Sequence, residues 1–396
     1  MNFLRRLSTR SLVVFAVGVL ALAGGGAALA VAAGGGGPTP PPKALDQAIH
    51  DALSAGAPDG VTAQITFTNN LFPSGALLGQ TGSALMTGAS GRLWLTNDGR
   101  GRVELQSSAG DVQIVWNTKT ITVYDASSNT VYRADLPAAK TGPSDPTGST
   151  PETKAPPALA EIDKLLTSIG VHAALSMAQP TNVGGQPAYS VLASPKHDGG
   201  LLGSVELAWD ASKGVPLRVG IYAQGNTTTP VLELAVSDIA YGAVATGDVA
   251  VAPPAGAKVV DLGTGTHTGT DAGGSGTPAV TGLGPVSAAA GFTVVAPDTL
   301  VGLPRQDVRL VGGNTALVVY GQGLGAIVVV ERKAGTAAGS PNQLQGLPTV
   351  SLDGITAHEL ATQLGTILEW QSGTTSYVLA GSLPPAAAEA AAKTLK

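Results

Sequence analysis

Between Val61 and Val236, apolar and polar residues alternate in many short segments. The clearest segment is 61–68, with the sequence VTAQITFT, and 102–106 and 120–124 repeat its pattern. A period of two places alternate side chains on opposite faces of a strand, so each segment is predicted to have one buried and one solvated face. Many such strands in succession predict one large antiparallel sheet with a single apolar face.

Turn and helix signals separate these strands. Residues 97–99 (NDG) and 117–119 (NTK) lie between alternating segments and are predicted to be hairpin turns. Helices are predicted at 42–55, 158–169 and 384–395, where apolar residues recur with helical spacing or prolines open the segment. The order of helix, strands, helix and strands lacks the regular spacing of a parallel sheet, so we expect an α+β protein.

One set of residues is predicted to line the apolar side of the sheet. About nine strands at a spacing of ~4.8 Å make a sheet roughly 45 Å wide, which two helices about 18 Å long cannot cover if it is flat. The sheet can curl and fill its hollow with side chains, or stay partly open and bind an apolar ligand. The candidate cavity residues are Val61, Ile65, Phe67, Leu93, Leu95, Val103, Leu105, Ile114, Trp116, Ile121, Val123, Leu207, Trp209, Leu217, Val219, Ile221 and Leu234.

The N-terminus is an apolar segment behind a basic one. Arg5, Arg6 and Arg10 precede the uncharged stretch from Leu12 to Ala33. This pattern is typical of a secretory signal peptide, and the stretch is also long enough to remain as a membrane anchor. Either interpretation predicts an extracytoplasmic protein, secreted or anchored at the outer face of the cytoplasmic membrane.

Low-complexity segments then divide the rest of the chain. The predicted units are a signal peptide or anchor at 1–37, a β domain at 38–260 with a flexible insertion at 137–157, a Gly/Thr linker at 261–281, and a small α+β domain at 282–396. Strands of the small domain are predicted at 292–295, 308–311, 316–320, 326–331, 366–370 and 376–379.

Composition and charge exclude several classes of function. The chain has no cysteine, so it has no disulfide, no thiolate metal site and no thiol nucleophile. Without the three N-terminal arginines, 19 basic residues (22 minus 3) stand against 27 acidic ones, a net charge of −8. Such an acidic chain is expected not to bind nucleic acid.

The polar residues show no catalytic arrangement. The five histidines are scattered without metal-ligand spacing, and no nucleophile, base and orienting group can be placed together. We therefore predict a protein that is not an enzyme, with no metal and no cofactor. Arg92, Arg102 and Arg218 occupy polar strand positions, where an arginine is usually solvated, although one at the rim of a cavity could bind a head group.

Several segments resemble one known family. Residues 209–219 (WDASKGVPLRV) resemble the strand–turn–strand signature of LolA-type lipoprotein carriers. Residues 236–239 and 253–259 are similar to that family's closing strand and tail, and 115–133 to a pair of its strands. The resemblance covers about 43–260.

This resemblance implies a half-open β-barrel closed by helices, with an apolar cavity for acyl chains. Residues 368–384 look like the ending of the small domain in RseB-type stress regulators, which join a LolA-like domain to a C-terminal one. The implied function is an exported, non-enzymatic binder or carrier of lipid or lipoprotein acyl chains, with the helices at 43–55 and 158–169 as candidate lids. The alternative is an envelope-stress regulator that binds a membrane protein through its C-terminal domain. In both cases, residues 12–33 would contact the membrane if they are retained.

Overall fold

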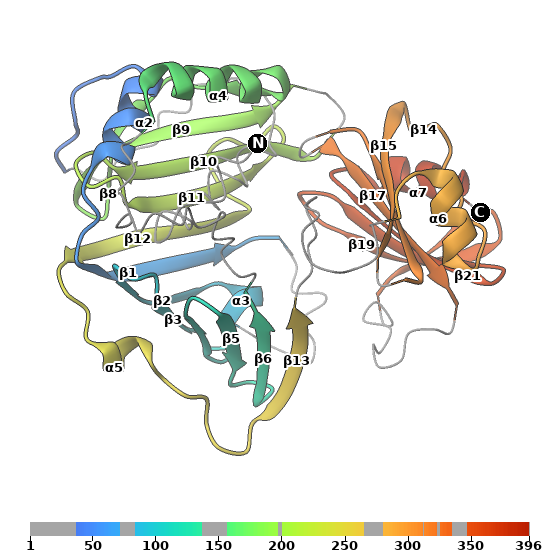
Figure 1. The fold of residues 1–396 in the computed structure, drawn as a ribbon, viewed down its shortest axis with the longest axis horizontal. Coiled ribbons are helices and arrows are strands. Elements are labelled where there is room, and N and C mark those ends of the chain that lie inside the picture. Colours follow the sequence, from blue (N-terminus) through green and yellow to red (C-terminus); the bar gives the residue numbers. More distant parts are fainter. Residues whose placement is uncertain are drawn as a thin grey trace, which may run out of the picture.

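The computed structural model describes most of the chain as two units, each built on one sheet (Figure 1). The described residues are 37–71, 84–136, 157–196, 200–264, 280–311, 313–322, 325–334 and 347–395. The apolar N-terminal stretch, the insertion and most of the linker lie outside these residues, so what the sequence indicates about them stays a prediction.

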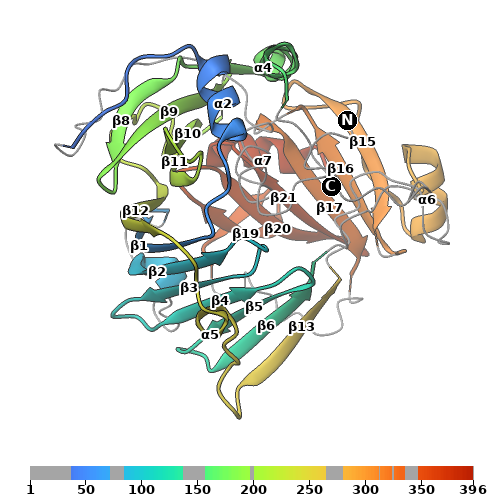
Figure 2. The same cartoon turned by 60° about the vertical axis from the view of Figure 1, so that its left-hand side comes forward.

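The larger unit is a curved sheet of 13 strands in the order β13-β6-β5-β4-β3-β2-β1-β12-β11-β10-β9-β7, with β8 paired to β9 (Figure 2). Every pairing is antiparallel except that of β13 with β6. The strands are β1 (Gly60–Asn69), β2 (Ala89–Thr96), β3 (Gly101–Gln106), β4 (Val112–Trp116), β5 (Thr120–Asp125), β6 (Thr130–Asp135), β7 (Ala173–Leu175), β8 (Gln179–Val183), β9 (Gln186–Pro195), β10 (Leu202–Asp210), β11 (Pro216–Ala223), β12 (Leu232–Tyr241) and β13 (Lys258–Thr264).

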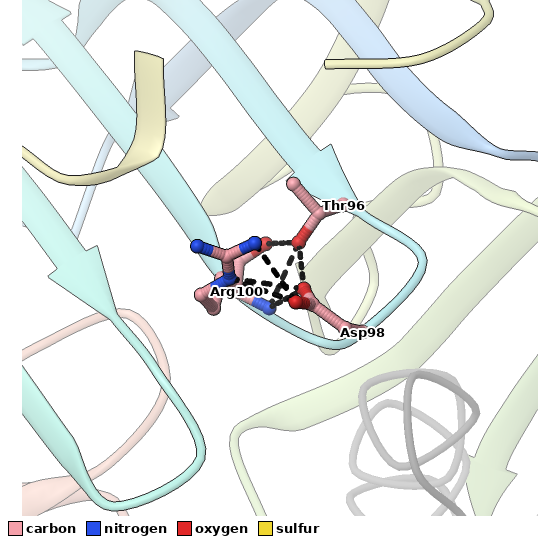
Figure 3. Close-up of polar contacts among 3 residues, drawn as sticks. All are labelled: Thr96, Asp98 and Arg100. Atoms are coloured by element: carbon pink, nitrogen blue, oxygen red, sulfur yellow. Dashed lines mark hydrogen bonds and ion pairs between the residues drawn. The ribbon is translucent and has the colours of Figure 1, made fainter. Parts of the chain in front are cut away.

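The hairpin between β2 and β3 shows how the sequence fixes these connections. Gly99 has a φ of 87°, which a glycine adopts without strain. The Asp98 carboxylate receives hydrogen bonds from the Thr96 hydroxyl and from Arg100 Nε, the latter at 2.9 Å (Figure 3). These hydrogen bonds, that of Arg100 first, lower the pKa of Asp98 to about 2. The turn predicted from the NDG sequence is therefore confirmed.

Few helices accompany the large sheet. They are α2 (Leu45–Ser54), α3 (Ala84–Thr87), α4 (Leu159–His172) and α5 (Thr246–Val249). α2 and α4 confirm the first two predicted helices, although α4 continues through Gly170 to His172 instead of ending at residue 169. In Figure 1, α2 and α4 lie at the β9 end of the sheet, and α3 lies near β1 and β3.

The smaller unit is an antiparallel sheet of eight strands in the order β14-β15-β16-β17-β21-β20-β19-β18. Helices α6 (Leu283–Ala290) and α7 (Pro385–Lys393) pack against it and share its continuous apolar core. The strands are β14 (Thr299–Leu300), β15 (Leu303–Val311), β16 (Thr315–Tyr320), β17 (Ile327–Lys333), β18 (Thr349–Leu352), β19 (Ile355–Ala361), β20 (Thr366–Ser372) and β21 (Thr375–Gly381). The chain is thus α+β, as predicted.

One strand predicted for the small unit is wrong, and two of its strands were not predicted. Residues 292–295 do not form a strand. They form an irregular segment, and the Val295 N–H donates to the buried carboxylate of Glu331 on β17. β18 and β19 were not predicted, because polar residues such as His358 and Glu359 weaken the alternation in their sequence.

Candidate apolar binding face

The cross-strand register places sixteen of the seventeen candidate cavity residues on one face of the large sheet, which we call the apolar face. The other, Leu217, lies at an irregularity in the pairing of β10 with β11. In one row, Ala63 is opposite Leu93, Leu93 is opposite Val103, and the row continues through Ile114 to Val123. Another row joins Val61, Leu95, Gly101, Trp116 and Ile121. On the far side of β1, Phe67 is opposite Leu234, which is opposite Val219, and Val219 is opposite Leu207.

Helix α2 covers the part of this face formed by β9, β10 and β11. Ala48 of α2 is buried with Leu207 and Trp209, and Val219 and Ile221 pack against the same cluster. Trp209 is only 5% exposed. This part of the apolar face therefore forms a packed core.

Polar contacts fasten α2 in that position. The Tyr189 hydroxyl on β9 donates to the Pro41 carbonyl oxygen at 2.7 Å. Lys43 lies 2.5 Å from the Asp51 carboxylate and stands over the Tyr189 ring. The hydrogen bond from Lys43 to Asp51 lowers the pKa of Asp51 and raises that of Lys43.

The part formed by β1 to β5 and β12 is more open. Val61, Ile65 and Leu105 are buried there, whereas Leu234 on β12 is 44% exposed. The remaining candidates on these strands are half-buried: Phe67, Leu93, Leu95, Val103, Ile114, Trp116, Ile121 and Val123. Leu217 on β11 is buried with the core of this part.

Charged residues occupy the opposite face. Arg218 donates to Glu206 Oε1 at 2.6 Å, and the Tyr222 hydroxyl donates to Glu206 Oε2 at 3.0 Å. Burial, reinforced by the charge of Glu206, raises the pKa of Tyr222. Arg102 pairs with Glu104 and stands 4.9 Å from the centre of the Trp94 ring.

The three strand arginines considered for a head group do not share the apolar face. The register places Arg92, Arg102 and Arg218 on the face opposite the apolar one, since each neighbours an inward residue in the alternation. Arg102 and Arg218 are already paired with glutamates.

Within the described residues no group of three or more His, Asp or Glu side chains could hold a metal. Among the helices of the described residues, none is long and apolar enough to cross a membrane.

Some residues of the apolar face were missed by the sequence analysis because they are small. Ala63, Gly91 and Gly101 lie in the same rows as the candidates. Each lies two residues along its strand from a candidate residue, so the alternation places it on the same face. They were not predicted because only large apolar side chains were chosen as candidates.

No protein-family model matches the chain, and no curated protein matches it significantly. Among solved structures, the chain is similar to MucB in complex with MucA(peri), with 15% identity and a TM-score of 0.42, over 88% of this chain and 96% of that one. It is also similar to the Pseudomonas aeruginosa MucA/MucB complex, with 14% identity and a TM-score of 0.40, over 87% of this chain and 95% of that one. A third similar structure is a putative outer membrane lipoprotein-sorting protein domain from Vibrio parahaemolyticus, with 12% identity and a TM-score of 0.21, over 52% of this chain and 96% of that one.

Proposed function

We propose that this protein is an exported, non-enzymatic binder of lipid or lipoprotein acyl chains, and that the chains bind on the open part of the apolar face. The observation that carries the proposal is the contrast between the two parts of that face. α2 packs over β9 to β11, while eight large apolar side chains on β1 to β5 stay half-buried. Apolar side chains left partly exposed side by side are typical of a site that an apolar ligand covers.

The dimensions of the face suit one acyl chain. Along β1, six residues separate Val61 from Phe67, which at ~3.3 Å per residue is roughly 20 Å. A bilayer core of ~30 Å is two chains thick, so one chain needs about 15 Å. Burial of a sixteen-carbon chain gains about 12 kcal/mol at ~0.8 kcal/mol per methylene, before ordering costs are subtracted. Val, Leu and Ile side chains supply this gain without any polar contact.

Release of the chain requires a part that moves, and α4 is better suited than α2 to be that part. α2 is fastened by Tyr189 and buried with β9 and β10. α4 contacts α2 and β7 at the margin of the sheet, and Ile162 is its buried apolar residue among those described. We infer that α2 is a permanent cover of β9 to β11, and that α4, at the margin of the sheet, is the more movable of the two helices.

Native mass spectrometry of the full chain, extracted gently from its own membrane, tests the proposal. We expect a lipid or acylated species bound near one per chain. Ile114→Asn places an amide on the apolar face and should abolish the bound species. Val115→Asn, on the same strand but the opposite face and also half-buried, should leave it bound. A wild-type protein that carries no acyl chain, and binds no added acyl-chain probe, would refute the proposal.

A regulatory role is the second candidate. It is favoured by the small unit, which has its own apolar core and is hydrogen-bonded to the large unit by Ser382. In this role the small unit would bind a membrane-protein partner, and the similar protein MucB is known in complex with MucA(peri). Deletion of 282–396 should spare acyl-chain binding in both roles and abolish partner binding only in the regulator. An extracytoplasmic location is proposed for either.

A further inference from the structure

The tryptophan at the end of β4 lies in a different environment from the other three. Trp209 and Trp370 are buried in the cores of the two units. Trp94 lies on the charged face of the large sheet, beneath Arg102. Trp116 is half-buried on the apolar face, in the row of Leu95 and Ile121.

A glycine makes room for this indole. Gly101 on β3 is directly opposite Trp116, and the six-membered ring of the indole lies across it. A Cβ atom at position 101 would stand 2.6 Å from Cε2 and 2.7 Å from Cη2 of that ring, which is closer than atoms can approach. Gly101 is buried and has no left-handed backbone conformation that would require glycine. The lack of a side chain at position 101 therefore serves the placement of the indole.

We propose that Trp116 is an aromatic contact for the bound acyl chain of a lipid, and that Gly101 is the positioning residue that keeps the indole low enough for the chain to pass over it. This inference rests on the proposed function and names two residues of its site. An indole that lies across a glycine adds a wide apolar surface without filling the space above β3. Any side chain at position 101 would lift the ring into the space that the ligand needs.

The polar ends of the neighbouring hairpins support a ligand contact at this row. Beyond Leu95 the chain enters the turn in which Thr96, Asp98 and Arg100 bond to one another. Beyond Trp116, Asn117 Oδ1 accepts the N–H groups of Lys119 at 2.8 Å and Thr120 at 2.9 Å. The polar groups of both turns are therefore bonded within the turns, and the residues opposite Trp116 on the adjacent strands are Gly101 and Ile121.

Fluorescence quenching by a phospholipid with brominated acyl chains tests the contact with Trp116. In the full chain we expect binding of this lipid to quench tryptophan emission. Trp116→Phe should remove most of the quenched signal, while Trp94→Phe, the matched control on the opposite face, should leave it unchanged. Equal quenching in the wild type and in Trp116→Phe would overturn the proposal.

Substitution of the glycine tests the positioning role. Gly101→Ala should weaken lipid binding by at least about fourfold, the change in affinity expected when about one methylene of the acyl chain is no longer buried. Gly101→Ala combined with Trp116→Phe removes the overlapping ring atoms and should restore most of the affinity. Gly247→Ala, at an open position in α5, is the control and should change nothing. Failure of the double variant to recover affinity, with its melting temperature at the wild-type value, would overturn the positioning role.

The same experiments separate the two levels of the proposal. If mass spectrometry and quenching both detect no bound lipid in the wild type, the proposed function fails and this inference fails with it. If the lipid binds but neither Trp116→Phe nor Gly101→Ala alters quenching or affinity, only this inference fails. An acylated peptide that binds while the lipid does not would assign the site to a lipoprotein and would also overturn the inference as stated.

Discussion

Ser382 accepts the Leu202 N–H on its side-chain oxygen at 2.8 Å, and this contact joins the small unit to the first residue of β10. The Ser382 carbonyl oxygen also accepts the Leu201 N–H at 3.0 Å. The same hydroxyl donates to the Leu364 carbonyl oxygen at 2.9 Å. A second contact between the units runs from Gln363 Nε2 to the Asn70 carbonyl oxygen at 2.5 Å. The small unit is thus bonded at the ends of β1 and β10, two strands that carry the apolar face.

Ser382→Ala should loosen this connection. The substitution leaves the Leu202 N–H without its acceptor, which costs about 1 kcal/mol for a partly buried group. We expect faster hydrogen exchange at Leu202, measured by mass spectrometry, with little change at the centre of β10. Ser376→Ala, at the opposite end of β21, is the matched control. Unchanged exchange at Leu202 in Ser382→Ala would show that the hydroxyl does not hold the units together.

Local alternation was enough to predict the apolar face but not what covers it. The alternation in β1, β3 and β5 determines which side chains share a face, and the NDG turn determines how β2 meets β3. The helical spacing in α2 predicts that one side of this helix is buried. The residues that bury it, Tyr189 and Trp209, are more than 130 residues from Ala48 in the sequence. A local pattern carries no information about such a partner.

Long-range pairing was beyond the sequence analysis for the same reason. β13 pairs parallel to β6, with Lys258 opposite Thr130, although no pattern in either segment specifies the other. Glu331 is a further case, because it occupies an inward position of β17 and the alternation alone cannot show that Val295 will provide its hydrogen bond. The half-burial of Leu93 and Ile114 likewise depends on which strands the helices cover, and the alternation does not specify this.

Glu331 should make the small unit less stable as the pH rises. Its side chain is 0% exposed, Oε2 accepts the Val295 N–H at 2.9 Å, and burial raises the pKa of the carboxyl from 4.5 to about 7. The folded state therefore favours the protonated form. The resulting stabilisation is complete below about pH 4.5 and is lost as the pH rises through about 7, with at most about 3 kcal/mol involved.

Thermal unfolding of the full chain between pH 5 and pH 8 checks this dependence. Glu331→Gln should flatten the pH profile of the small-unit transition and should raise its melting temperature at pH 8 relative to the wild type. Glu369→Gln removes a carboxylate that lies near Arg332 and should leave the profile sloping as before. If wild type and Glu331→Gln lose stability in parallel between pH 5 and pH 8, the carboxyl of Glu331 does not titrate in this range.

The ion pair of Glu206 and Arg218 should cost more when one partner is removed than when both are replaced. The Glu206 side chain is only 7% exposed, so Arg218→Met would leave a buried carboxylate with the Tyr222 hydroxyl as its remaining donor among the bonds described here. Loss of one partner of a buried pair typically costs about 3–5 kcal/mol. Glu206→Gln combined with Arg218→Met removes both charges and should recover much of that loss. Urea unfolding of the wild type, both single variants and the double variant measures the coupling. A double variant less stable than Arg218→Met would show that the carboxylate at 206 is not penalised by its burial, and that Glu206 contributes to the sheet independently of the arginine.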